Sequence, residues 1–112
     1  MDGEIFEIIN GDQKDHLITS GKVIFDLHPK ASIELNANLS LGHNLRTDSN
    51  AETYLKMHAV SRLTVNGYFK VFYGSSIEVF PEGVLTLGSG YINSGCVIAC
   101  ADRITIGNDA AI

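Results

Sequence analysis

Histidines are the residues of this chain best suited to acid–base or metal chemistry, because imidazole titrates near neutral pH and binds transition metals. His28, His43 and His58 recur every 15 residues, which suggests a zinc site, but 15 residues do not match the spacing of the repeats described below. No pair of histidines has the short spacing of a metal-binding motif, so we expect no metal site. His16, in the polar stretch GDQKDH, is expected to be a solvated loop residue.

Cysteines and glycines offer less chemistry. Cys96 and Cys100 lie in CVIAC, a spacing that fits neither a CxxC redox motif nor a zinc knuckle. We expect both to be small buried side chains in a reducing cytoplasm. Gly42, Gly88 and Gly107 recur without GxxxxGK or GxGxxG spacing, which favours turns over phosphate binding.

Composition excludes other function classes. The 112 residues suffice for one domain, and 13 acidic against 8 basic residues give a net charge of −5. This charge argues against a nucleic-acid partner. No apolar run approaches the roughly 20 residues of a membrane span. The start, MDGEIFEIING, lacks the features of a secretory signal.

The sequence contains short repeated segments, and these must form the elements that hold any functional side chain in place. Each is apolar–Ser/Thr–apolar followed by a turn-forming pair, in LSLGHN from Leu39, LTVNGY from Leu63, LTLGSG from Leu85 and ITIGND from Ile104. Their starts are 24, 22 and 19 residues apart, and SIEL from Ser32 and SIEV from Ser76 form a second echo. The pattern predicts short strands with alternating side chains, joined by turns that tolerate positive φ.

Toward the C-terminus the spacing tightens to six residues. Two apolar series show it, Cys100, Ile106 and Ile112, and Ile98, Ile104 and Ala110. Six residues for a strand and a turn are too few for a hairpin, and they favour a solenoid whose successive coils are hydrogen-bonded to one another. A β-sandwich is the competing fold, because short strands with turn signals also describe one.

The segment AETYLKMHAV, residues 51–60, is the best helical alternative, as one or two isolated turns. It alternates equally well as a strand, and we expect a strand that places Thr53, Leu55 and Met57 inward.

These residues carry a family resemblance. ITIGNDAAI, residues 104–112, looks like the hexapeptide signature of the left-handed parallel β-helix acyltransferases. The stretch 85–112 resembles the sugar O-acetyltransferase branch, which includes maltose, galactoside and capsular polysaccharide acetyltransferases. The resemblance implies an all-β fold, a single-stranded left-handed parallel β-helix of hexapeptide repeats. Residues 1–21 would be an N-terminal lead-in or cap, and residues 22–112 would be coils that stop before the catalytic coil.

The resemblance also implies an activity, acetyl-CoA-dependent O-acetylation of a sugar or polysaccharide in polysaccharide biosynthesis. It implies a homotrimer that binds acetyl-CoA between neighbouring subunits and needs no metal. A histidine would take the proton of the acceptor hydroxyl, and a backbone N–H would stabilise the oxyanion. In the family this histidine falls beyond the position of Ile112, so we expect the 112-residue chain alone to be inactive.

Three site residues follow from the resemblance. Asn93, in GYIN, corresponds to an asparagine that helps to hold the acceptor sugar, and Tyr91 to a nearby aromatic residue. The competing interpretations for Asn93 are a corner residue that tolerates a left-handed backbone, or a side-chain amide stacked along a ladder of coils. For Tyr91 the alternative is a surface ring that covers a corner. An acceptor-binding acid is expected near Ala101, and Asp102 lies one residue away, where a solvated turn residue is the alternative. A second functional hypothesis is a non-catalytic β-helical module for oligomerisation or carbohydrate contact, since no histidine present matches the family motif.

Overall fold

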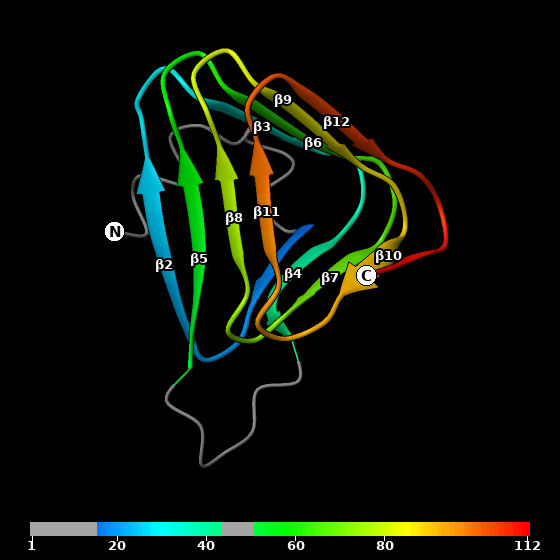
Figure 1. Cartoon of the computed structure of the whole chain (residues 1–112). Coiled ribbons are helices and arrows are strands. Elements are labelled where there is room, and N and C mark those ends of the chain that lie inside the picture. Colours follow the sequence, from blue (N-terminus) through cyan, green and yellow to red (C-terminus); the bar gives the residue numbers. More distant parts are fainter. Residues whose placement is uncertain (1–15, 44–50) are drawn as a thin grey trace.

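Successive strands of the chain join successive sheets, so that each sheet collects every third strand (Figure 1). The computed structural model describes residues 16–43 and 51–112. In these residues the fold is all-β, with three sheets in which every registered strand pair is parallel. Parallel pairing throughout excludes the antiparallel β-sandwich considered from the sequence.

The sheets are numbered here by their first strand. Sheet 1 has the order β1 (Leu17–Thr19), β4 (Leu39–His43), β7 (Phe69–Phe72), β10 (Gly90–Ile92) and β13 (Ala110–Ala111). Sheet 2 has the order β2 (Lys22–Leu27), β5 (Glu52–Met57), β8 (Ser76–Val79) and β11 (Val97–Cys100). Sheet 3 has the order β3 (Ser32–Leu35), β6 (Arg62–Val65), β9 (Val84–Leu87) and β12 (Arg103–Ile106).

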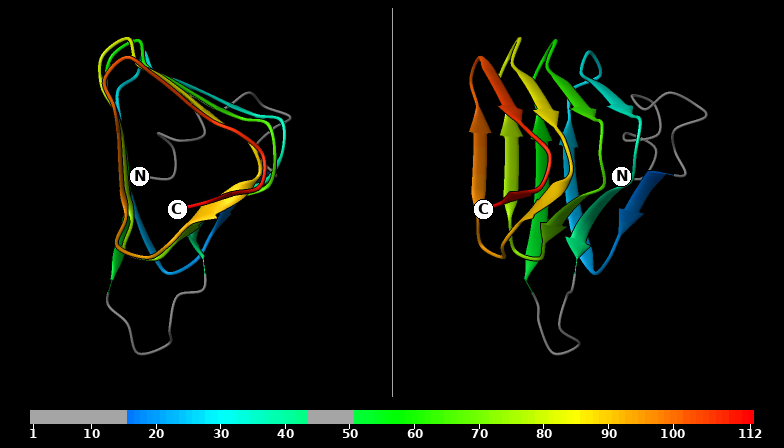
Figure 2. Two further views of the ribbon diagram at one scale, coloured as in Figure 1. Left: turned by 45° about the vertical axis from the view of Figure 1, so that its right-hand side comes forward. Right: turned by 90° about the vertical axis from the view of Figure 1, so that its right-hand side faces the viewer.

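The three sheets form the sides of a roughly triangular outline (Figure 2). Six residues carry the chain from one side to the next near the C-terminus, since Cys100 lies on β11 of sheet 2 and Ile106 on β12 of sheet 3. This arrangement is compatible with a β-helix. β1 already pairs with β4, so the strand order begins before Lys22.

Alternation along each strand decides which side chains face the core. In β5 the side chains of Thr53, Leu55 and Met57 are buried, whereas Tyr54 and Lys56 are exposed. The predicted strand and its inward face are therefore confirmed. Thr53 is tolerated inside because its hydroxyl accepts a hydrogen bond from the Gly74 amide at 3.2 Å.

Inward side chains stack in columns through the parallel register. Leu63 pairs with Leu85 and Leu85 pairs with Ile104, which confirms two of the three repeat offsets found in the sequence. The fourth member, Leu39, belongs to sheet 1, and the column continues through Ile33 instead. The alignment of Leu39 was wrong because six-residue units on all three sides share one pattern. SIEL and SIEV likewise lie in different sheets.

Leu63 lies in the middle of this column. Leu63→Ala should lower the free energy of unfolding by about 2–5 kcal/mol, because it removes a fully buried side chain and leaves a cavity. Thr64→Ala, one residue along on the outward face, should cost about 1 kcal/mol or less. Urea unfolding of both variants measures the difference. Equal losses would contradict the inward column.

Corners between sheets 2 and 3 are closed by stacked β-turns. The Ser61 amide donates to the His58 carbonyl at 3.3 Å, and the Gly83 amide donates to the Phe80 carbonyl at 2.8 Å. Within the first of these turns Val60 has a φ of 60° and a side chain that is 55% exposed. A β-branched residue with positive φ has a strained backbone. Because the Val60 side chain is mostly exposed, its burial contributes little stability to offset this strain.

Val60→Gly should therefore raise the free energy of unfolding by about 1 kcal/mol. Glycine relieves left-handed backbone strain of roughly 1–2 kcal/mol, and this gain exceeds the stability lost because glycine makes the unfolded chain more flexible. Val97→Gly is the matched control, because Val97 is even more exposed but lies in strand β11. That control should lower stability by roughly 0.5–1 kcal/mol. Losses of equal size in both variants, measured in urea, would show that Val60 is unstrained.

Candidate functional site

Two of the site residues suggested by the sequence lie together at the end of β10. The ring of Tyr91 is half-buried on the outward face of sheet 1, and Asn93 is exposed at the turn that follows. The backbone N–H of Asn93 donates to the Ile112 carbonyl at 2.8 Å. The backbone carbonyl of Asn93 accepts a hydrogen bond from the Ser75 hydroxyl at 2.8 Å. Bonds on both sides fix the backbone from which these side chains project.

Asp102 lies elsewhere. It is exposed at the turn between β11 and β12, whereas Asn93 precedes β11, so the two are at opposite ends of that strand. The Asp102 carbonyl accepts a hydrogen bond from the Val84 amide at 2.8 Å. The structure therefore does not bring Asp102 together with Tyr91 and Asn93.

Two further rings extend the site from Tyr91 across the sheet. The ring centroids of Phe72 and Tyr91 are 5.6 Å apart, and those of His43 and Phe72 are 5.0 Å apart in an edge-to-face arrangement. These three side chains, here called the aromatic row, come from the neighbouring strands β10, β7 and β4. Such ring pairs stabilise one another beyond simple burial, which fixes the row as a unit.

Local sequence explains why the rings point outward. In β7, FKVF, Phe69 and Val71 fill the core, and alternation then sends Lys70 and Phe72 to the outer face. His43 reaches the same face through a register shift in β4 between Leu41 and His43.

Glycine permits this register shift. Gly42 has a φ of 76°, and a Cβ atom added to it would collide with the Ser20 carbonyl oxygen. Only glycine therefore fits at this irregularity, which sets His43 opposite Phe72 in the ladder.

Sequence reasoning missed His43 and Phe72 as partners of Tyr91. The alternation in FKVF identifies Phe72 as an outward ring, but only the register between strands shows which rings it meets. Lys70 was missed in the same way. It aligns with Ser40 on one side and with Tyr91 on the other, and its ammonium lies 5.4 Å from the centroid of the Tyr68 ring.

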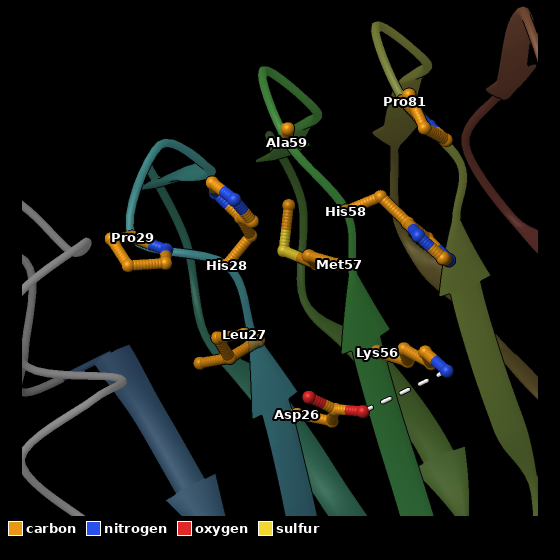
Figure 3. A pocket seen from close by; sticks show the side chains of 9 residues that line it. All are labelled: Asp26, Leu27, His28, Pro29, Lys56, Met57, His58, Ala59 and Pro81. Atoms are coloured by element: carbon orange, nitrogen blue, oxygen red, sulfur yellow. Dashed lines mark ion pairs between the residues drawn. The ribbon is translucent and has the colours of Figure 1, made fainter.

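A second feature is a surface pocket at the corner between sheets 2 and 3 (Figure 3). Its volume is about 440 Å³, and its lining residues are Asp26, Leu27, His28, Pro29, Lys56, Met57, His58, Ala59 and Pro81. The ion pair drawn across its rim joins Lys56 and Asp26 at 3.7 Å between exposed side chains. Such pairs contribute little to stability.

The two histidines of the corner pocket are held differently. The Nδ1 atom of His28 accepts a hydrogen bond from the Lys30 amide at 3.0 Å, which leaves the ring proton on Nε2. The Nε2 atom of His58 lies 2.7 Å from a carboxylate oxygen of Glu78. The His58 ring also stacks on Phe80, with centroids 5.2 Å apart. Each imidazole is therefore oriented by a neighbour of its own.

The evenly spaced histidines do not form one column. His28 and His58 lie on the same corner, where the His28 amide donates to the Met57 carbonyl, but His43 belongs to the aromatic row on sheet 1. Among residues 16–43 and 51–112, no three His, Cys, Asp or Glu side chains gather as a group that could hold a metal ion. The zinc hypothesis has no support in this part of the chain.

The structure also shows the surroundings of His16 and of the two cysteines. His16 is half-buried, and its Nδ1 atom lies 2.8 Å from the Asn38 side-chain oxygen, so the prediction of a solvated loop residue was wrong. Cys100 is buried as expected, whereas Cys96 is only half-buried, and both are free thiols. None of the residues that the structure describes forms a helix long and apolar enough to cross a membrane.

A polar cluster lies on the outer face of sheet 2, away from the aromatic row. The Lys22 ammonium is 2.7 Å from one Glu52 carboxylate oxygen, and the Tyr54 hydroxyl donates to the other at 2.9 Å. The hydrogen bond from Lys22 is the main cause that lowers the pKa of Glu52. The hydrogen bond to Glu52 raises the pKa of Tyr54 and of Lys22.

Glu52→Gln should bring the pKa of Tyr54 down toward 10.0 and that of Lys22 toward 10.5, because the carboxylate causes both shifts. Glu52 contributes stability above its ordinary pKa of 4.5, and this is lost as pH falls through its lowered folded value. The Lys22 and Tyr54 contributions are present below their unfolded pKa values and are lost as pH rises through the raised ones.

NMR titration of the Tyr54 ring carbons and the Lys22 side chain measures these changes. Glu78→Gln, on the same face but bonded to His58, is the control and should leave both titrations unchanged. A Tyr54 titration that is the same in Glu52→Gln as in the parent chain would contradict the cluster.

Comparisons of the chain with protein-family models, with curated proteins and with solved structures each found no match. The acyltransferase hypothesis therefore rests on the hexapeptide resemblance in the sequence alone.

Proposed function

We propose that this chain is a left-handed parallel β-helix of hexapeptide repeats and forms part of an acetyl-CoA-dependent O-acetyltransferase that acts on a sugar or polysaccharide hydroxyl. What supports the fold is the strand order, in which neighbours within each sheet are three apart along the chain. The six-residue step between sheets supports the hexapeptide repeat. The left-handed winding comes from the resemblance.

The observation that carries the sugar-binding proposal is the outward pair of Tyr91 and Asn93 at the end of β10, beside Phe72. An aromatic face can cover the apolar C–H face of a pyranose ring, and an amide can both donate to and accept from its hydroxyls. Few polar groups beside an apolar surface are the usual composition of a small-molecule site.

In the proposed reaction the acceptor hydroxyl attacks the thioester carbonyl of acetyl-CoA, and coenzyme A leaves as the thiol. A histidine would remove the hydroxyl proton, but no described histidine matches the family motif, so the proposal assigns this role to none of them. The homotrimer, with acetyl-CoA between subunits, is part of the same proposal and comes from the resemblance. The cytoplasmic location is also proposed, and it comes from the expectation that Cys96 and Cys100 are reduced thiols.

A second candidate is a non-catalytic module that contacts carbohydrate. The aromatic row favours it, because three rings on one sheet face provide a binding surface that needs no catalytic base. The two candidates share the surface around Tyr91 and differ in whether acetyl groups are transferred.

Acetylation separates them. Deletion of the gene that encodes this chain should lower the O-acetyl content of the host cell's polysaccharides, measured by alkaline release of acetate. The parent gene and an Asp102→Ala gene should restore it, because Asp102 lies at another corner, whereas Tyr91→Ala should not.

Unchanged acetyl content in the deletion strain would contradict the enzyme. If purified chain then still bound glycan through Tyr91, the module would remain. Equal complementation by Tyr91→Ala and Asp102→Ala genes would remove Tyr91 from the site.

A further inference from the structure

The outer faces of the three sheets carry different sets of charged residues. Sheet 2 presents the acids Asp26, Glu52 and Glu78 outward together with Lys22 and Lys56. Sheet 3 presents Arg62 and Arg103 together with Glu34. The strands of sheet 1 contain no Asp or Glu, and Lys70 is their one Lys or Arg. In an acidic protein with a net charge of −5, this lysine lies on β7, the middle one of the three strands that carry the aromatic row.

We propose that the aromatic row and Lys70 together bind an acidic glycan, an oligosaccharide whose sugar units carry carboxylates. The proposal rests on the proposed function, because it names the class of acceptor that the surface around Tyr91 would take. The occupant is defined by two properties of the surface, its length and its charge.

Length indicates an oligosaccharide. The rings of His43, Phe72 and Tyr91 come from three neighbouring strands, so the row extends over two strand spacings, roughly 10 Å. A ligand that contacts all three rings must run across the strands and exceed a single pyranose ring. Asn93 lies next to Tyr91 and offers hydroxyl contacts at that end of the row.

Charge indicates an acid. Lys70 aligns with Tyr91 in the ladder, so its ammonium projects from the same face as the ring that would carry the sugar. The Tyr68 ring at 5.4 Å orients the ammonium without neutralising it, because a cation–π contact leaves the charge in place. In contrast, Lys22 and Lys56 on sheet 2 are paired with Glu52 and Asp26. A carboxylate would therefore be drawn to the ammonium of Lys70, whereas the two lysines of sheet 2 already have acidic partners.

Calorimetric titration at low ionic strength with hexagalacturonate, and with maltohexaose as its neutral counterpart, tests the inference. Hexagalacturonate should bind about tenfold more tightly, the effect of one charge-assisted hydrogen bond. Lys70→Gln should abolish that preference without weakening maltohexaose, and Lys70→Arg should keep it. Phe72→Ala should weaken both ligands about tenfold or more.

Matched controls on sheet 2 make the outcome specific. Lys56→Gln removes the same charge from another face, and Tyr54→Ala removes an exposed ring, so neither should change binding to either ligand. Amide NMR spectra confirm that each variant is folded.

The inference is overturned if the two oligosaccharides bind equally, if neither binds, or if Lys56→Gln acts like Lys70→Gln. Its failure is distinguishable from that of the proposed function. Acidic preference with unchanged polysaccharide acetylation in the deletion strain would contradict the enzyme alone. Lost acetylation without acidic preference would contradict this inference alone.

Discussion

Parallel, in-register pairing of each strand with the strand three places later is the constraint on which the rest of the structure depends. It stacks inward side chains in columns, such as Ile33, Leu63 and Leu85, so that each covers the next. It stacks outward side chains in the same way, and the Asn36 amide donates to the Asn66 side-chain oxygen at 2.9 Å. A residue's place in its strand therefore decides both whether it is buried and which side chains it meets.

The candidate site is a direct product of this stacking. His43, Phe72 and Tyr91 are far apart along the chain, yet they form one row because β4, β7 and β10 are neighbours. The register shift at Gly42 completes the row by bringing His43 opposite Phe72. This face, with three rings and a single lysine, differs from that of sheet 2, where acids and lysines form ion pairs. The triangular arrangement therefore gives one small chain distinct surfaces.

Part of this could be predicted from the sequence. Alternation in ETYLKM revealed a strand and its inward residues, because burial follows a period of two whatever the strand's partners are. The side of the triangle that each unit occupies could not be predicted. LSLG and LTVN have the same pattern but lie in sheets 1 and 3. The number of residues between paired positions also varies. Ile33 and its partner Leu63 are 30 residues apart, whereas Leu63 and its partner Leu85 are only 22 apart. The aromatic row and the separation of Asp102 from Asn93 both depend on that register.

The most direct test of this account is the measurement of scalar couplings across hydrogen bonds by NMR, which identify the acceptor carbonyl of each amide. The structure predicts couplings from the Phe69 amide to the Asn38 carbonyl and from the Gly90 amide to the Tyr68 carbonyl. Observing both would establish that the three strands carrying the aromatic row are neighbours in parallel register. Couplings from these amides to the adjacent strand in sequence, as in a hairpin, would contradict the fold and the site built on it.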